Sequence, residues 1–370
     1  MSGSLRPSAP PVLVVGSASI HTARFARGLC EAGQPVVLVT HGAMPVEPHA
    51  ALLDVVSLDL SVRAWHAPRR LRRLMQRWSP RVVHAHQANS VGWHAGRAAH
   101  GSGVPVVLTL WGSDVLAMPS ISPLHRWMVR RALAAAAAWT ADARTVLEAA
   151  VALHGSSRPA PQAHWIPLGI DDPPPRPLQG PGAQQERRIL SCRLHKPIYR
   201  IDAVVAAFAA LAQDQPAWTL EVAASGPGTG DLVRLAAKRG VAGRVEFTGM
   251  LGPAALARSY QRAALFASVP VSDGTSVSLL EAMAAGCMPV LSDLPANREW
   301  VTDGRNGVLV ADIGELEQGL RRAIAWWESG RWASEGIAPN LQTIREKALF
   351  KVNVQQFLAL YARLAGGPAS

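Results

Sequence analysis

Short runs of aliphatic and β-branched residues recur along this chain, and a stretch with helical spacing follows nearly every one of them. A strand buried on both faces reads as a continuous apolar run, whereas a half-exposed strand alternates between apolar and polar residues. The repeated order of strand and helix therefore predicts α/β domains with parallel sheets and helices on both faces. The expected strands cover residues 12–16, 36–40, 81–86, 105–112, 188–193, 219–226, 244–249, 265–270, 288–293 and 307–310.

A proline-rich stretch at residues 167–188 interrupts this alternation. We therefore expect two doubly wound, Rossmann-like domains: residues 1–170 and residues 188–344, joined by a linker at 171–187. A C-terminal helix near 345–366 is expected to pack back on the first domain. Ligands of such sheets bind beyond the carboxyl ends of the strands, so a cleft between the two facing domains is the expected site.

The positive charge of the chain is concentrated in its first half. Of a formal net charge of +11, residues 1–170 contribute +9 from sixteen arginines and seven acidic residues, with no lysine. One basic domain beside a nearly neutral one indicates an anionic partner, and a membrane surface, a nucleic acid or a phosphorylated substrate would each satisfy this.

Other features exclude several protein classes. The three cysteines, Cys30, Cys192 and Cys287, are far apart and form no disulfide or metal-binding pattern, which is typical of reduced thiols in the cytoplasm. The polar, proline-containing N-terminus does not read as a signal peptide. The most apolar helical candidate, at residues 132–139, is far shorter than the ~20 residues that span a bilayer. We therefore expect a cytoplasmic protein without a membrane-spanning segment.

The stretch "SDGTSVSLLEAMAAG" at 272–286 places carboxylates on both sides of a turn that leads into a helix. The N-terminus of a helix attracts anions, and Gly274, Thr275 and Ser276 allow the backbone to approach a phosphate closely. Asp273 and Glu281 then lie where they would hold separate parts of one ligand. The alternative is that Asp273 caps the helix and Glu281 is a solvated helix residue.

Basic and glycine residues follow other strands of the second domain. Arg193 and Lys196, in "SCRLHKP", come directly after its first strand and would neutralise a diphosphate. "ASGPG", which contains Gly226, and "FTGML", which contains Met250, end two further strands in a way that lets a planar base lie against backbone. Each signal is weak by itself.

In this order, the motifs resemble the nucleotide-sugar domain of a family 4 glycosyltransferase, a retaining family of the GT-B fold. The resemblance covers residues 188–311 and also includes "VEFTG" at 245–249 and "ANREWVTDGRNGVLV" at 296–310. The family usually has Glu-x7-Glu where this chain has Asp273 and Glu281. The first carboxylate is therefore one methylene shorter here.

The first domain resembles the acceptor domain of the same family more loosely. "SASIHTARFARGLCEAGQPVVLVT" is similar to its first glycine loop and helix, which places Gly16 on the donor-binding side and His21 on the acceptor side. "VVHAHQA" and "LTLWGSDVL" are similar to two further landmarks and add His86 and Asp114. The alternatives are that His86 is a packed strand end, as for its neighbour His84, and that Asp114 caps the next helix.

The resemblance implies transfer of a hexose-type sugar from a nucleotide-sugar donor with retention of anomeric configuration. Arg193 and Lys196 would hold the diphosphate and stabilise the leaving group. Glu281 would bind the ribose, and Asp273 with the backbone at 274–276 would hold the sugar, while His86 would join the catalytic group. We expect no cofactor and no metal, because there is no Asp-x-Asp and no histidine cluster with ligand spacing.

An arginine-rich segment predicts where the positive charge acts. A helix over residues 68–78 would align Leu71, Leu74, Met75 and Trp78 in one stripe, and a basic amphipathic helix of this kind suits an anionic membrane. A core-packed helix with a solvated arginine face is the alternative. A second basic segment lies at 124–133. The expected membrane-surface residues are Arg69, Arg70, Arg72, Arg73 and Trp78.

These observations predict a peripheral enzyme at the inner face of the cytoplasmic membrane. Its acceptor would be a lipid-linked intermediate of lipopolysaccharide, capsule or exopolysaccharide synthesis. A soluble saccharide acceptor is the first alternative, and a donor-binding protein without turnover is another. A nucleic-acid-binding protein is indicated only by the sequence pI of about 10.6, and no binding motif of that class is evident. We therefore expect no nucleic-acid partner.

Overall fold

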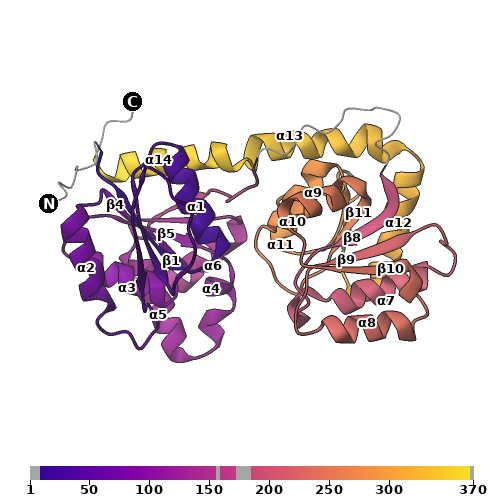
Figure 1. The fold of residues 1–370 in the computed structure, drawn as a ribbon, viewed down its shortest axis with the longest axis horizontal. Coiled ribbons are helices and arrows are strands. Elements are labelled where there is room, and N and C mark those ends of the chain that lie inside the picture. The colour runs from indigo at the N-terminus through magenta and orange to yellow at the C-terminus, as the bar shows by residue number, and fades with distance from the viewer. Residues whose placement is uncertain (1–8, 156–158, 172–184, 367–370) are drawn as a thin grey trace. The chain divides into compact units, whose positions relative to one another are not determined.

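The computed structural model describes residues 9–155, 159–171 and 185–366. The chain divides into two compact units (Figure 1). Unit 1 comprises Met1–Leu168 and Phe350–Ser370, and unit 2 comprises Gly169–Leu349. Unit 2 begins and ends close to one point, since its residues Ile170 and Leu349 pair in a short parallel bridge. The expected linker at 171–187 lies mostly outside the described residues.

Within the described residues, unit 1 contains a seven-stranded parallel sheet with the order β3-β2-β1-β4-β5-β6-β7. Its strands are β1 (Val12–Ser17), β2 (Val36–His41), β3 (Leu52–Leu58), β4 (Val82–His86), β5 (Val106–Leu110), β6 (Ala138–Ala141) and β7 (Gln162–Trp165). Its helices are α1 (Ile20–Glu31), α2 (Ala67–Trp78), α3 (Ser90–Ala99), α4 (Ser113–Leu116), α5 (Pro123–Ala135), α6 (Arg144–His154) and α14 (Phe350–Leu364). The central strands are buried on both faces, as their continuous apolar runs predict.

Helices cover both faces of this sheet. On one face, α1 and α14 share a core with alternate residues of the central strands. There, Gly28 of α1 permits contact with α14, since an ideal Cβ at this position would lie 2.4 Å from Phe350 Cζ. Helices α2, α3 and α5 are neighbours (Figure 1). The last helix of the chain is thus part of unit 1 rather than of the unit that precedes it.

Unit 2 has the same arrangement within its described residues. Its six-stranded parallel sheet has the order β10-β9-β8-β11-β12-β13. The strands are β8 (Glu186–Ser191), β9 (Thr219–Ala223), β10 (Val245–Gly249), β11 (Ala263–Ser268), β12 (Met288–Ser292) and β13 (Val308–Val310). The helices are α7 (Ile201–Leu211), α8 (Thr229–Lys238), α9 (Pro253–Arg262), α10 (Val277–Ala285), α11 (Pro295–Arg298), α12 (Leu316–Glu328) and α13 (Ile337–Lys347).

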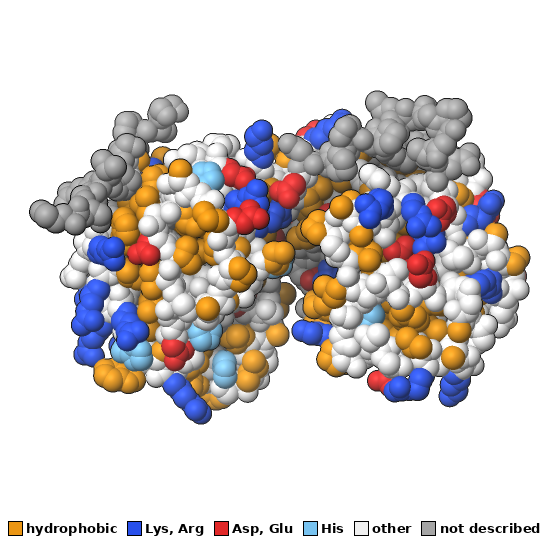
Figure 2. Space-filling view, viewed as in Figure 1, with side chains coloured by type: hydrophobic (Ala, Val, Ile, Leu, Met, Phe, Trp, Pro, Cys, Tyr) orange, Lys and Arg blue, Asp and Glu red, His pale blue; other side chains and the backbone are white. Residues whose placement is uncertain are grey.

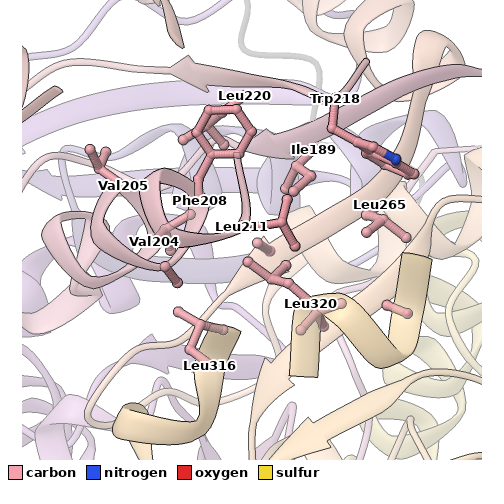
Figure 3. Packing of buried hydrophobic residues seen from close by; sticks show 14 of the residues in the cluster. Ile189, Val204, Val205, Phe208, Leu211, Trp218, Leu220, Leu265, Leu316 and Leu320 are labelled. Atoms are coloured by element: carbon pink, nitrogen blue, oxygen red, sulfur yellow. The ribbon is translucent and has the colours of Figure 1, made fainter. Parts of the chain in front are cut away.

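The core of unit 2 joins α7, α8 and α12 to one face of this sheet. Figure 3 shows Phe208 and Leu211 of α7 directed toward strand residues such as Leu220, with Leu316 and Leu320 of α12 beside them. Complete burial of side chains this large contributes roughly 1.5–3 kcal/mol each relative to their exposure. The core therefore holds the strand ends, and the loops that follow them, in fixed positions.

One sequence-based expectation is wrong in this fold. Residues 132–139 read as an apolar helix, but α5 ends at Ala135 and β6 begins at Ala138. Alanine fits both structures, and the buried indole of Trp139 decides between them by packing in the sheet layer, where its Nε1 donates to Leu133 O at 3.0 Å. Of the other strands, β3 and β7 were not predicted; β7, "QAHW", has no apolar run.

Candidate active site

The strand order of unit 2 reverses between β8 and β11, so the loops after these strands lie together at the carboxyl edge. Arg193 comes from the first loop, and Asp273 and Ser276 come from the second. Arg193 Nη2 lies 2.6 Å from Asp273 Oδ2, and Arg193 Nη1 donates to Ser276 Oγ. The side chains of Arg193 and Asp273 are only 11 % and 20 % exposed. The structure thus brings three of the predicted site residues together.

Two side-chain hydrogen bonds hold the second loop, one within the loop and the first turn of α10 and one from Trp300. Ser276 is the N-cap of α10, and its Oγ accepts from Leu279 N at 3.4 Å. Thr275 Oγ1 accepts a bond of 3.1 Å from the indole of Trp300. Because both hydroxyl groups are buried and bonded to the protein, the free backbone groups at the start of α10 have a fixed orientation.

Asp273 turns both carboxylate oxygens toward groups of its own chain. One oxygen takes the ion pair with Arg193, and the other accepts from Gly274 N at 3.1 Å. Burial raises the pKa of Asp273, and the adjacent guanidinium opposes this shift. The short side chain therefore orients Arg193. Direct contact of Asp273 with a sugar remains a prediction.

Glu281 is separated from that ion pair by its own set of partners. It lies in α10, is half-buried, and accepts a bond of 2.9 Å from Tyr260 OH. Burial holds the pKa of Tyr260 well above its usual value, so this hydroxyl remains a donor. Its oxygen also lies 3.2 Å from Cys192 Sγ. Asp273 and Glu281 therefore have separate environments and do not form an acid–base pair.

Arg193 and Lys196 present different cationic groups. The guanidinium of Arg193 lies 4.4 Å from the ring centroid of Tyr199, and only two of its five N–H donors are used by Asp273 and Ser276. The side chain of Lys196 is exposed. Both residues therefore keep donors for an anion, one in a fixed fork and one on a flexible stem.

His195, between these two cations, is a buried residue that the sequence analysis missed. Its Nδ1 lies 2.7 Å from Thr229 Oγ1, and its carbonyl oxygen accepts from Gly228 N at 3.1 Å. An ideal Cβ on Gly226 would lie 2.7 Å from the same carbonyl oxygen, so only glycine fits. Gly226 thus lets the loops after β8 and β9 touch. No sequence pattern around His195 indicated that its backbone would contact the loop after β9.

The remaining predicted donor-side residues lie at other loop ends. Met250 follows β10 and is 67 % exposed, and Gly249 before it has φ of 69°, a conformation that favours glycine. In unit 1, Gly16 at the end of β1 is buried, and an ideal Cβ there would lie 2.8 Å from Thr22 Oγ1. Its structural role is to let the first turn of α1 approach β1. Donor contact by Gly16 and Met250 remains a prediction.

The switch point of unit 1 lies between β1 and β4 and carries histidines. His86 ends β4, is 98 % buried and has Nδ1 3.4 Å from Thr22 Oγ1. Desolvation, with a smaller contribution from His21, lowers the pKa of His86 to about 3, so the imidazole is neutral at pH 7. Within the described residues its Nε2 has no hydrogen-bond partner. A catalytic role for His86 remains a prediction.

His84, on the same face of β4, is part of the core. Its Nδ1 lies 2.5 Å from Tyr361 OH of α14, and its Nε2 lies 2.5 Å from Thr109 Oγ1 of β5. Burial lowers its pKa well below the usual value. The alternation of the strand correctly predicts that His84 and His86 share one face. His84 joins the C-terminal helix to the sheet.

The two acceptor-side candidates differ in exposure. Asp114 is 99 % buried and accepts from Ala88 N at 2.6 Å and Trp111 N at 3.0 Å, so it ties the loops after β4 and β5 together. Burial raises its pKa, and the backbone donors oppose the shift. His21 is exposed, with its ring 5.6 Å from that of Trp111. Asp114 is therefore not the N-cap of α4, which is Gly112, and its place on the acceptor side remains a prediction.

The predicted membrane helix has its apolar stripe turned inward. Leu71 and Met75 of α2 are buried in unit 1, while the arginines are exposed. Arg72 Nε and Nη2 donate to carbonyl oxygens at the end of α3, at 3.0 Å to Ala98 and 2.7 Å to His100. Helix α2 is therefore the core-packed helix with a solvated basic face. Its stripe is not available to a lipid bilayer.

Within residues 9–155, 159–171 and 185–366, no group of three or more His, Cys, Asp or Glu side chains is arranged to hold a metal ion. In the same ranges, no helix combines the length and apolar character needed to cross a membrane.

Both units match known protein families. Residues 12–142 match the family described as "Glycosyl transferase 4-like", and residues 186–325 match "Glycosyl transferases group 1", so the two matches together cover most of the chain. The chain belongs to the glycosyltransferases of the GT-B fold. The order of the two matched segments follows the order of the two sheets.

Individual relatives of this glycosyltransferase are distant. It is 30% identical over 139 residues to alpha-monoglucosyldiacylglycerol synthase from Streptococcus pneumoniae, a match that covers 38% of this chain and 32% of that protein. Its fold is similar to that of sucrose-phosphate synthase from Thermosynechococcus elongatus, with a TM-score of 0.77 and 17% identity, covering 96% of this chain and 99% of that chain. The HepE protein of Anabaena, solved in complex with UDP, has a TM-score of 0.73 and 15% identity, covering 95% and 100%.

Proposed function

We propose that this glycosyltransferase moves a hexose-type sugar from a nucleotide-sugar donor to a lipid-linked acceptor, with retention of anomeric configuration. The observation that carries the proposal is the cluster of Arg193, Asp273 and Ser276 at the switch point of unit 2, where ligands of such sheets bind. A guanidinium held in place beside the N-terminus of α10 forms a site for a diphosphate.

The proposal gives separate tasks to the residues around this cluster. Arg193 and Lys196 would stabilise the negative charge that develops on the leaving nucleoside diphosphate. The backbone amides at the start of α10 would bind its phosphate oxygens, while Glu281 would accept from the ribose hydroxyl groups. Asp273 would keep the fork of Arg193 oriented before the donor arrives, so that little reorganisation accompanies the reaction.

The donor base and the acceptor are proposed from the relatives. HepE is solved with UDP, which supports a UDP-sugar donor. The Streptococcus pneumoniae relative is named for the synthesis of a glucosylated diacylglycerol, which supports a lipid acceptor. The concentration of positive charge in unit 1 favours an acceptor presented at an anionic membrane surface. The resemblance to family 4 supports retention.

A screen of donors and acceptors tests this function. UDP-, GDP- and ADP-sugars are compared by thermal shift, and the stabilising donors are then incubated with diacylglycerol in vesicles or with soluble saccharides. We expect a UDP-sugar to raise the melting temperature and to glycosylate the lipid, and NMR of the product to show the anomeric configuration of the donor. Transfer only to soluble saccharides would replace the proposed acceptor. DNA binding with a steep salt dependence and no donor binding would contradict the proposal entirely.

A further inference from the structure

A pocket of unit 1 is lined by three arginines of one helix. Arg126, Arg130 and Arg131 of α5 border a cavity of about 410 Å³ together with Pro123, Trp127, Ala134 and His154. All three arginines are exposed, and within the described residues none of them forms an ion pair. The described residues that line the pocket include no carboxylate. The pocket is therefore strongly cationic.

Neighbouring structure does not neutralise this charge. The guanidinium of Arg130 lies close to the C-cap of α6, since its Nη2 would be 3.7 Å from an ideal Cβ on Gly155. The carboxyl end of a helix carries about half a negative elementary charge, which offsets only a small part of three positive charges. His154, 92 % buried at the same helix end, has no hydrogen-bond partner at Nε2 within the described residues.

The same helix exposes apolar side chains beside its arginines. Leu124 is 54 % exposed and Trp127 is 49 % exposed, and their spacing of three residues places them on one face of α5. Ile121, just before the helix, is 65 % exposed. The indole of Trp127 is held by an edge contact with Trp93 of α3, with ring centroids 5.8 Å apart. Trp is favoured where one end of a side chain is apolar and the other is wet.

Helix α2 lacks this combination, although it carries more arginines. Its apolar stripe is buried, and Arg72 is occupied at the end of α3. Figure 2 shows Lys and Arg side chains gathered over α2 along one margin of unit 1. Trp65, just before α2, is also exposed, with the guanidinium of Arg69 over its ring, but the described pocket of unit 1 that is lined by arginine forks lies at α5.

We propose that the α5 pocket, formed by Arg126, Trp127, Arg130, Arg131 and His154, binds the phosphate group of an anionic phospholipid. Arginine forks bind phosphate oxygens, and Leu124 and Trp127 enter the outer layer of the bilayer beside the headgroup. This rests on the proposed membrane acceptor and names the element that meets the membrane. It also moves the lipid contact from α2, where the sequence placed it, to α5.

Flotation of the full-length protein with vesicles tests the proposal. Vesicles of phosphatidylcholine are compared with vesicles that also contain phosphatidylglycerol. Because each basic residue near an anionic surface contributes about fivefold in affinity, the triple variant R126Q/R130Q/R131Q should bind the anionic vesicles about a hundredfold more weakly. The matched variant R69Q/R70Q/R73Q removes the same charge from α2 and should lose less than about fivefold. Equal loss in the two variants, or no loss in either, would overturn the proposal.

Two further experiments distinguish a pocket for a lipid phosphate from non-specific electrostatic attraction and from a site for free phosphate. The triple variant R126K/R130K/R131K keeps the charge but lacks the forks, and it should bind about tenfold more weakly than wild type. Wild-type affinity in this variant would show that charge alone acts. Binding of inorganic phosphate in calorimetry without binding to anionic vesicles would show that the ligand is a free phosphate, and would overturn the lipid assignment.

The outcome is independent of the proposed reaction. Donor binding belongs to unit 2, so the thermal shift with UDP should be the same in wild type and in all three variants. Vesicle binding that depends on α5 in a protein that binds no nucleotide would contradict the proposed function and leave this site standing. If the protein responds normally to the nucleotide and the α5 variants bind vesicles like wild type, the α5 site is contradicted and the proposed function stands.

Discussion

The two units have closely related strand orders, and in both the order reverses between the first strand and its neighbour at the centre of the sheet. In unit 2, the loops at this point carry an ion pair, Arg193 with Asp273, whose guanidinium keeps free donors. In unit 1, the corresponding edge carries the neutral, buried imidazole of His86, whose Nδ1 lies 3.4 Å from Thr22 Oγ1, and the buried carboxylate of Asp114, which accepts from two backbone amides. One topology thus supports an edge prepared for an anion and an edge fixed mainly by packing.

Our proposal that the donor binds to unit 2 rests on this difference. A diphosphate requires cationic groups, and Arg193 offers a guanidinium held in position while Lys196 offers an ammonium group on a flexible stem. In unit 1, five arginines lie on α2 and three on α5, and others lie on α1, α3 and α6. We accordingly propose that the charge at the sheet edge of unit 2 binds a small ligand and that the charge on the helices of unit 1 meets a surface.

Removal of Arg193 should have the largest effect. Arg193→Ala should lower the rate of sugar transfer by about a thousandfold, since it removes the main group that stabilises the departing diphosphate. Steady-state kinetics with the preferred donor measures this. The matched control is Arg234→Ala, which removes an exposed, ion-paired arginine of α8 in the same unit and should keep normal rates. A rate within a few-fold of wild type in Arg193→Ala would remove unit 2 from its assigned role.

Acid should weaken unit 1 through its buried histidines. The pKa of His86 is about 3 in the native state and about 6.5 in the unfolded chain, so between these values only the unfolded chain binds the proton. The free energy of unfolding should then fall by about 1.4 kcal/mol for each pH unit below 6.5, until pH approaches 3. Urea unfolding followed by circular dichroism at pH 7, 6 and 5 measures this dependence.

His86→Gln is the control for that measurement. Glutamine does not titrate, so the loss of stability with acid should be smaller in the variant by the share of His86, with His84 still contributing. The raised pKa of Asp273 in unit 2 acts in the opposite direction, because there the native state binds its proton at a higher pH than the unfolded chain. An identical pH dependence in wild type and variant would contradict the buried, neutral state of His86.

Glu281 should affect donor affinity more than stability. Glu281→Gln keeps an acceptor for Tyr260 OH but replaces charge-assisted hydrogen bonds to the ribose with neutral ones, and the Kd for UDP should rise about thirtyfold. Isothermal titration calorimetry measures the change. Glu335→Gln, at an exposed ion pair of the same unit, should leave the Kd as it is. A Kd for Glu281→Gln that equals wild type would place the ribose elsewhere.

The smallest predicted effect tests how α14 is attached to unit 1. Tyr361→Phe removes the hydroxyl that bonds to His84 Nδ1 and should lower the free energy of unfolding by about 1–2 kcal/mol. Donor affinity should not change, because this contact lies in the core of unit 1. Urea unfolding and calorimetry with UDP measure the two quantities. A larger loss of UDP affinity than of stability would mean that the core of unit 1 is energetically coupled to the donor site proposed in unit 2.

Much of the fold could be predicted because buried parallel strands have a continuous apolar pattern. The short strand β7 has no such pattern, and its position depends on pairing with β6. The prediction of one helix over residues 132–139 was wrong because alanine is compatible with both helix and strand. The sequence also could not distinguish the two environments of an apolar helical stripe: the spacing of Leu71 and Met75 is the same whether they face a core or a bilayer.

The sequence indicated which residues lie at the candidate site, but it did not indicate which of them contact one another. Loop positions after strands indicated Arg193 and Ser276, since the carboxyl ends of parallel strands meet at one edge, and Glu281 was indicated by its place in the helix that follows. Which group Asp273 binds depends on the length of its side chain and on the path of its loop, and neither is visible in a motif. The contact of His195 with the loop of Gly226 is equally a product of tertiary packing.

Hydrogen exchange with and without UDP tests most directly whether unit 2 holds the donor. Amide exchange followed by mass spectrometry separates the two units by peptide. We predict that UDP slows exchange at residues 192–199 and 273–281, the two loops that meet at Arg193, and that peptides of α2 and α5 are unaffected. Protection confined to unit 1, or none at these two loops in a protein that binds UDP, would contradict the assignment.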